Sequence, residues 1–95
     1  MLAIDLNYDR KFDVLYARVT NYSPSYGDEV DGIVTLYSIE SDSITGMTIY
    51  NAKQRIRQGN IDAASLPLPI DLNALCVQRL LNEPDKGFRC TLQLV

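Results

Sequence analysis

The chain has 95 residues with a net charge of −3, and 46% of its residues are hydrophobic, which fits one small globular domain and excludes a disordered chain. It contains no histidine, which excludes Ser-His and Cys-His catalysis, its two cysteines are too few for a usual zinc site, and its acidic balance makes it a poor nucleic-acid binder. No segment has the basic start of a signal peptide or the apolar length of a membrane span, so we expect a cytoplasmic protein without a membrane partner, cofactor or metal.

Two strands joined by a tight turn are predicted at the start of the chain. Apolar residues occupy every second position from Leu2 to Tyr8, as in a strand with one wet face. Asp9 opens a polar turn, and a second strand follows over residues 14–19. Asp9 and Asp13 are the nearest approach to paired carboxylates, but we expect both to bond to turn backbone rather than to act as an acid and a base.

The acidic residues concentrate in the first part of the chain. Residues 1–42 carry three Lys or Arg against eight Asp or Glu, for a net −5, while residues 43–95 carry a net +2. The acidic part either serves solubility alone or docks onto a basic partner. Asp28, Glu29 and Asp31 offer oxygens that Ca²⁺ prefers, but the fuller ligand loop is absent, so we expect a solvated acidic loop.

Ser, Pro, Gly and Asp crowd into residues 21–29, which predicts a loop. The third strand, residues 32–39, has apolar groups on both sides and is therefore expected to be central and covered on both faces. The fourth strand runs over residues 44–50, where Gly46 indicates a bulge or a close backbone approach.

A helix is predicted directly after the fourth strand. Asn51 is a good N-cap, residues 52–58 are mostly strong helix formers, and Gly59 ends the helix.

This helix carries the one dense basic cluster of the sequence, formed by Lys53, Arg55 and Arg57. Positions 53 and 57 share a helical face, whereas position 55 points away. The cluster is either a solvated helix face or, with Tyr50 nearby, a contact for phosphates or an acidic partner.

The last third of the chain is predicted to hold an extended connector over residues 61–70, which contains two prolines, and a second helix capped by Asp71 that ends before Pro84. The apolar stripe of this helix comprises Leu72, Leu75, Cys76, Leu80 and Leu81. We predict free thiols at Cys76 and Cys90, as in a reducing compartment. The alternative is a disulfide, which requires the C-terminal strand to pack on the helix that bears Cys76.

Residues 88–95 alternate between apolar and polar side chains and predict a terminal strand. Such a strand must find an edge that satisfies its amides, either in its own sheet or in that of a neighbour. Phe88, Leu92 and Leu94 are therefore candidate partner-binding residues, beside the basic cluster.

Several short motifs recur in the order and spacing of a known family. They are Tyr8-Asp9, Asp13-Val14-Leu15-Tyr16, Glu29 with Gly32-Ile33, and Gly46-Met47-Thr48-Ile49 with Ala52. Over residues 6–57 the chain thus resembles the small bacterial domain of unknown function numbered twenty-two eighty-three. The resemblance implies an antiparallel sheet with a helix packed on it, supplies no catalytic residues, and suggests antitoxin-like partnership with a small toxin. This chain departs from the family at Leu36 or Tyr37, where members usually have Asp.

We predict a single α+β domain with a mainly antiparallel sheet of four or five strands and two helices packed on one face. Residues 1–58 form its ββββα core, and residues 59–95 add the connector, second helix and terminal strand. The expected function is a non-enzymatic protein-interaction module, a homodimer because small sheet domains gain stability by burying an edge, with an antitoxin-like role toward a small basic protein. The alternatives are a histidine-free RNase-like or phosphate-binding protein that uses Lys53, Arg55 and Arg57, and a small-ligand-binding module lined by tyrosines.

Overall fold

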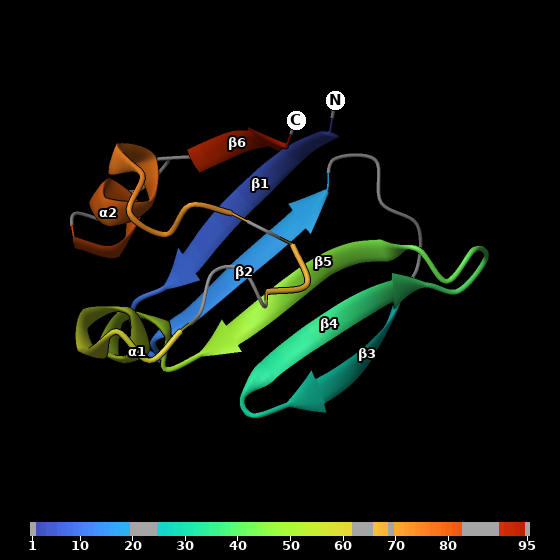
Figure 1. The fold of residues 1–95 in the computed structure, drawn as a ribbon, viewed down its shortest axis with the longest axis horizontal. Helices are drawn as coiled ribbons and strands as arrows, with labels where there is room; N and C mark the ends of the chain where they lie inside the picture. Colours follow the sequence, from blue (N-terminus) through green and yellow to red (C-terminus); the bar gives the residue numbers. More distant parts are fainter. Residues whose placement is uncertain (1, 20–24, 62–65, 69, 83–89, 95) are drawn as a thin grey trace.

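The computed structural model describes residues 2–19, 25–61, 66–68, 70–82 and 90–94. Its elements are β1 (Leu2–Asp9), β2 (Val14–Val19), β3 (Ser25–Val30), β4 (Ile33–Ser38), β5 (Ile44–Tyr50), α1 (Ala52–Gln58), α2 (Leu75–Asn82) and β6 (Cys90–Leu94). The strands form one antiparallel sheet in the order β3-β4-β5-β2-β1-β6 (Figure 1). The α+β class and the antiparallel sheet are confirmed. The predicted count of four or five strands is wrong, because the sheet has six.

The missed strand is β3, most of which falls in the loop predicted for residues 21–29. Its sequence, Ser-Tyr-Gly-Asp-Glu-Val, is rich in turn formers and poor in the β-branched residues that mark strands. It is extended because the two-residue turn Asp31-Gly32 folds it back onto β4, pairing Val30 with Ile33. Both turn residues have positive φ, 52° and 78°, as a type I′ hairpin turn requires. Tertiary pairing thus overrides local propensity.

One face of the sheet holds the core. The inward residues of its central strands include Ile4, Leu6, Leu15, Ala17, Met47 and Ile49. Ala52 of α1, Val77 and Leu80 of α2, and the connector residues Leu66 and Leu68 are buried in the same cluster. Both helices and the described connector therefore cover the same face, which we call the core face.

Gly46 marks an irregularity in β5, as predicted. Leu36 pairs with Gly46 and Tyr37 pairs with Ile44, which leaves Thr45 as an extra residue in β5. A Cβ at Gly46 would also lie 2.6 Å from the carbonyl oxygen of Ala17. The bulge and the close backbone approach are both present.

The second helix begins later than expected. Asp71 forms a turn in which its carboxylate accepts a hydrogen bond from the Asn73 amide at 2.9 Å, and α2 then starts at Leu75. Leu75 is 89% exposed, so its place in the apolar stripe is wrong. The late start gives the inward face to Val77 instead, together with Leu80 and Leu81, which follow at helical spacing.

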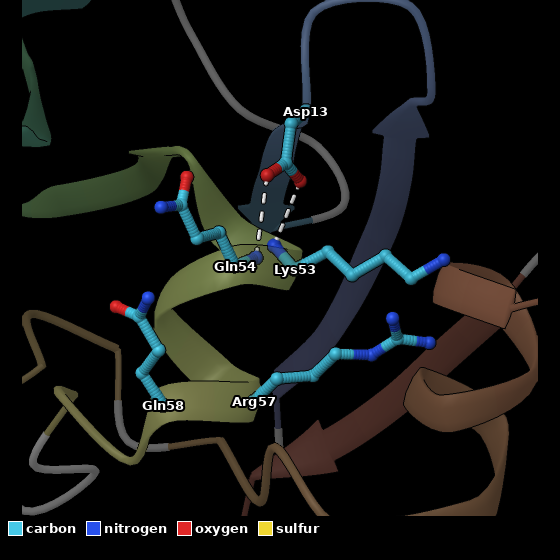
Figure 2. Close-up of a pocket in the computed structure, with 5 residues that line it drawn as sticks. All are labelled: Asp13, Lys53, Gln54, Arg57 and Gln58. Carbon is cyan, nitrogen blue, oxygen red and sulfur yellow. Dashed lines mark hydrogen bonds between the residues drawn. The ribbon is translucent and has the colours of Figure 1, made fainter.

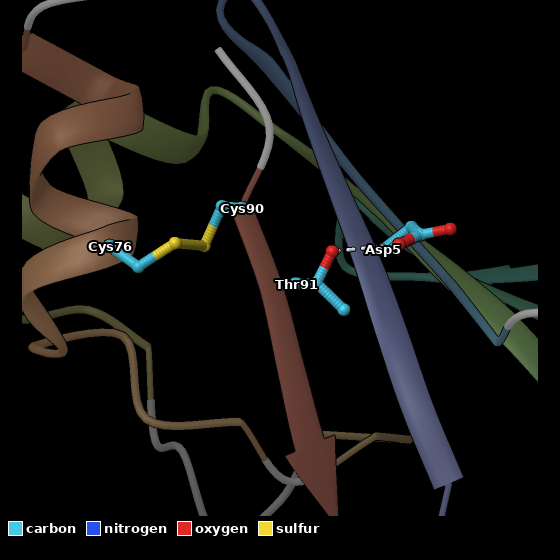
Figure 3. The surroundings of a disulfide bond; sticks show 4 residues. All are labelled: Asp5, Cys76, Cys90 and Thr91. Atoms are coloured by element: carbon cyan, nitrogen blue, oxygen red, sulfur yellow. Dashed lines mark hydrogen bonds between the residues drawn. A yellow bond between two sulfur atoms is a disulfide. The ribbon is translucent and has the colours of Figure 1, made fainter.

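Cys76 and Cys90 form a disulfide between α2 and β6 (Figure 3), so the prediction of free thiols is wrong. The Cα atoms are 5.6 Å apart, within the usual range for a disulfide, because β6 pairs with β1 beside α2. Disulfides persist mainly in oxidising compartments, so this bond weighs against the reducing compartment assumed above. The cytoplasmic location stays a prediction. Among the described residues, none of the helices has the length and apolar character needed to cross a membrane.

The described part of the terminal strand adds to its own sheet. Leu92 packs against the core, Leu94 lies opposite Leu2 in the ladder, and the Thr91 hydroxyl lies 3.0 Å from a carboxylate oxygen of Asp5 (Figure 3). Phe88 lies outside the described residues.

Candidate functional site

Asp13 ties the turn after β1 to the start of α1 (Figure 2). Its main-chain carbonyl accepts a hydrogen bond from the Ala52 amide at 3.0 Å. Its carboxylate accepts hydrogen bonds from the amides of Lys53 at 2.7 Å and Gln54 at 3.3 Å. The Tyr8 hydroxyl donates to the same carboxylate at 2.7 Å. Asp13 therefore satisfies three consecutive amides of the first helical turn, the groups that an N-cap normally serves.

Asn51 is the N-cap residue of α1 as predicted, but its side chain does not cap the helix. Asn51 has a left-handed conformation, φ 55°, and its side chain makes no capping hydrogen bond. Asn tolerates this conformation better than most residues, so it turns the chain from β5 into α1 while Asp13 supplies the cap. Asp9 does bond to its turn, accepting from the amides of Lys11 at 3.0 Å and Phe12 at 3.2 Å. The same expectation for Asp13 is wrong, because its carboxylate reaches the helix instead.

This network keeps Asp13 ionised. Burial alone would raise the pKa of the Asp13 carboxyl, but the hydrogen bonds from Tyr8, Lys53 and Gln54, with the charge of Lys53, lower that pKa below its ordinary value. The pKa of Tyr8 is raised by burial and by its hydrogen bond to Asp13. Neither shift moves its group toward the neutral pKa that suits a general acid or base. The pair is a structural anchor.

The basic cluster is divided between two sides of α1. Lys53 and Arg57 extend side by side from one side of α1, where they line an open depression with Asp13, Gln54 and Gln58 (Figure 2). An anion in this depression would meet the two cations but also the Asp13 carboxylate. The amides that could bind a phosphate at this helix start already serve Asp13.

The partners of the arginines fix the orientation of α1. Arg55 turns away and donates to the main-chain carbonyl of Asp31 at 3.0 Å. Arg57 donates to the side-chain oxygen of Asn82, in α2, at 2.9 Å. The cluster thus joins α1 to the β3–β4 turn and to α2, and the structure does not bring its three cations together.

The β3–β4 hairpin, residues 25–38, lies beyond the layer formed by the helices and the connector (Figure 1). Along β3 the side chains from Tyr26 to Val30 are exposed, and along β4 those from Ile33 to Tyr37 are only half-buried. The prediction that residues 32–39 are covered on both faces is wrong, since the sheet continues past the elements that cover it. No strand in the described part of the chain pairs with the outer edge of β3.

Aromatic and aliphatic side chains form a row across the core face of this hairpin. Tyr26 and Tyr37 are cross-strand partners, and their rings stack with centroids 5.3 Å apart. Ile44 lies opposite Tyr37 on the next strand. The Tyr26 hydroxyl donates to Asp42 at 2.9 Å, and this hydrogen bond raises the pKa of Tyr26. At the other end of β3, Val30 is 65% exposed.

The charged side chains that the hairpin and its flanking turn themselves carry are all acidic. The sequence has no Lys or Arg between Arg18 and Lys53, and this stretch contains five acidic residues: Asp28, Glu29, Asp31, Glu40 and Asp42. Successive strand residues point to opposite faces, so the carboxylates of Asp28 and Glu29 diverge and do not form one cation site. Arg18 stands at the inner margin on β2, and Arg55 reaches the turn from α1.

Comparisons with known proteins do not suggest a function for this chain. No family model, no curated protein and no solved structure matches the chain. The resemblance to the numbered domain family stays a prediction.

Proposed function

We propose that the protein is a non-enzymatic protein-interaction module that binds its partner through the β3–β4 hairpin. The observation that carries the proposal is that, among the described residues, no strand pairs with the outer edge of β3 and no helix covers the last two strands of the sheet. An exposed edge offers a row of backbone donors and acceptors, which is the usual docking site for an added strand.

The exposed side chains support this assignment. Aromatic residues are enriched in protein interfaces, and here Tyr26 of the hairpin is exposed, as are the aliphatic side chains of Val30 in the hairpin and Ile44 in β5. By contrast, the Asp13 carboxylate and the Arg57 guanidinium of the α1 depression are engaged in structural bonds. The same module can serve the antitoxin-like role suggested by the resemblance, which requires a protein partner.

Self-association, expected from the small size of the domain, is the second candidate use of this edge. In antiparallel registers centred on Asp28 or Glu29, the carboxylate would lie directly opposite its own copy, which is destabilising. A second copy therefore fits the β3 edge less well than a partner of different charge. Sedimentation of the purified chain tests this point, and a monomer at high concentration would remove the homodimer.

Site-specific photocrosslinking in an extract of the native host tests the proposal. A photoactivatable residue at Val30 is compared with one at Leu75, another exposed aliphatic position, on the helix that packs at the opposite end of the sheet. We expect a discrete protein adduct at Val30 and none at Leu75. Adducts at neither position would refute the proposal. RNA cleavage that disappears in the Lys53→Ala, Arg57→Ala double variant would favour the RNase-like alternative.

A further inference from the structure

Resting on the proposed function, we infer that the partner of the β3 edge is an extended basic segment, rich in Lys or Arg and β-forming residues, that adds to the sheet as a further strand.

The pairing register determines which backbone groups are available. In a two-residue hairpin the residues that flank the turn form a hydrogen-bonded pair, here Val30 with Ile33. Bonding then alternates, so Asp28 also directs its backbone groups toward β4. Gly27 and Glu29 direct their N–H and C=O groups to the outer edge. An added strand would bond to these two residues.

The side chains of β3 define what the added strand meets on each face. On the core face, Asp28 stands between Tyr26 and Val30, so a carboxylate is flanked by apolar surface. A Lys or Arg opposite Asp28 can lay its aliphatic stem on the Tyr26 ring while its charged end reaches the carboxylate. On the other face Glu29 offers a second carboxylate, and Gly27 adds no side chain that would hinder approach.

The acidic side chains of the hairpin favour some added strands over others. Because no Lys or Arg occurs between Arg18 and Lys53, an acidic strand would meet carboxylates of like sign on both faces. The same acidic residues keep two copies of β3 apart, as charges on natural edge strands often do. A basic segment would instead attract the carboxylates of β3. The outer edge of β3 therefore disfavours a second copy of β3 and favours a strand of opposite charge.

A random decapeptide library displayed on phage, selected on the purified chain, tests the inference. Enriched peptides should carry Lys or Arg among β-forming residues, and the best one is then synthesised. We expect its binding to weaken at high salt, since exposed charges are screened. On binding, the amides of Gly27 and Glu29 should gain protection from hydrogen exchange, while those of Asp28 and Val30, already bonded to β4, should change little.

Variants at one position separate backbone pairing from charge. Glu29→Pro removes an outward amide that the protein's own ladder does not use and should weaken peptide binding about tenfold or more. Glu29→Gln keeps the amide and removes the charge, with an expected loss of roughly twofold to fivefold. Glu40→Gln, a charge change in the β4–β5 turn, is the matched control and should have little effect. Thermal unfolding verifies that each variant folds, and the exchange data decide the outcome if Glu29→Pro does not.

The outcomes distinguish this inference from the function on which it rests. Enrichment of acidic or uncharged peptides, or unchanged affinity in Glu29→Gln, overturns the basic partner while binding at the hairpin stands. A dimer that Glu29→Pro dissociates assigns the edge to a second copy and also overturns it. A library ligand that protects no β3 amide, together with no crosslink at Val30, removes both.

Discussion

Replacing Asp13 should destabilise the domain more than replacing any other exposed or half-buried acidic residue of the described chain, because Asp13 joins three elements. The Asp13→Ala change removes the carboxylate that accepts hydrogen bonds from Tyr8, Lys53 and Gln54. Loss of a capping carboxylate costs about 0.5–2 kcal/mol of unfolding free energy. Asp13 has φ 55°, and a left-handed conformation costs alanine roughly 1–2 kcal/mol more. We expect a total loss of about 1.5–4 kcal/mol.

Urea denaturation followed by circular dichroism measures this loss, and in a domain of this size each kcal/mol lowers Tm by about 4–8 °C. Two further variants divide the effect. Asp13→Gly removes the carboxylate but accepts the positive φ, so it should be more stable than Asp13→Ala. Asp13→Asn retains an oxygen acceptor and tolerates the backbone conformation, so it should lose least. Asp9→Ala is the matched control, since Asp9 serves only exposed turn amides. If Asp13→Ala is no less stable than Asp9→Ala, the capping role is refuted.

Three further measurements test the charge of Asp13, the disulfide and the orientation of α2. The folded-state pKa of Asp13 lies below its unfolded value of about 4. The stability that ionised Asp13 contributes is therefore fully present above the unfolded pKa and is lost as the pH falls through the folded pKa. Urea midpoints measured from pH 6 to 2 should decline more steeply in the wild type than in Asp13→Asn. Reducing the bond between Cys76 and Cys90, which are 14 positions apart, should cost about 3 kcal/mol of unfolding free energy. Dithiothreitol should therefore lower the Tm of the wild type but not that of the Cys76→Ser, Cys90→Ser double variant. Val77→Ala should lower the free energy of unfolding by about 1–3 kcal/mol, because Val77 is buried, and Leu75→Ala by less than about 0.5, because Leu75 is exposed. A larger loss for Leu75→Ala in urea denaturation would contradict this orientation of α2.

Local sequence patterns predicted the elements in which the type of each residue follows from its burial or from its position in a helix. Alternation along the sequence placed β1 and β2, because in each strand every second side chain is buried in the core, as Leu15, Ala17 and Val19 are in β2. The helix formers before Gly59 placed α1, and Gly59 ends it in the expected left-handed conformation with its amide bonded to the Ile56 carbonyl. These features depend on neighbours in sequence.

The features that the sequence did not reveal depend on distant contacts. Asp13 and Lys53 are 40 positions apart, so no local signal distinguishes the true cap of α1 from Asn51. The disulfide requires β6 to lie beside α2, which the spacing of two cysteines does not determine. The strand β3 had one signal, the Asp31-Gly32 pair between Val30 and Ile33, which is a strong mark of a two-residue hairpin. Its polar composition outweighed that mark.

The two ends of the sheet differ in a way that suits binding at one of them. At the β6 end, the disulfide joins the last strand to α2, and Thr91 bonds to Asp5 of β1. At the β3 end, the core is already complete under β5, β2 and β1, so a strand can add to β3 without repacking it. Residues that are distant and share no contacts usually contribute independently. Partner affinity can therefore be changed through Asp28 and Glu29 while stability is determined by Asp13, the disulfide and the core.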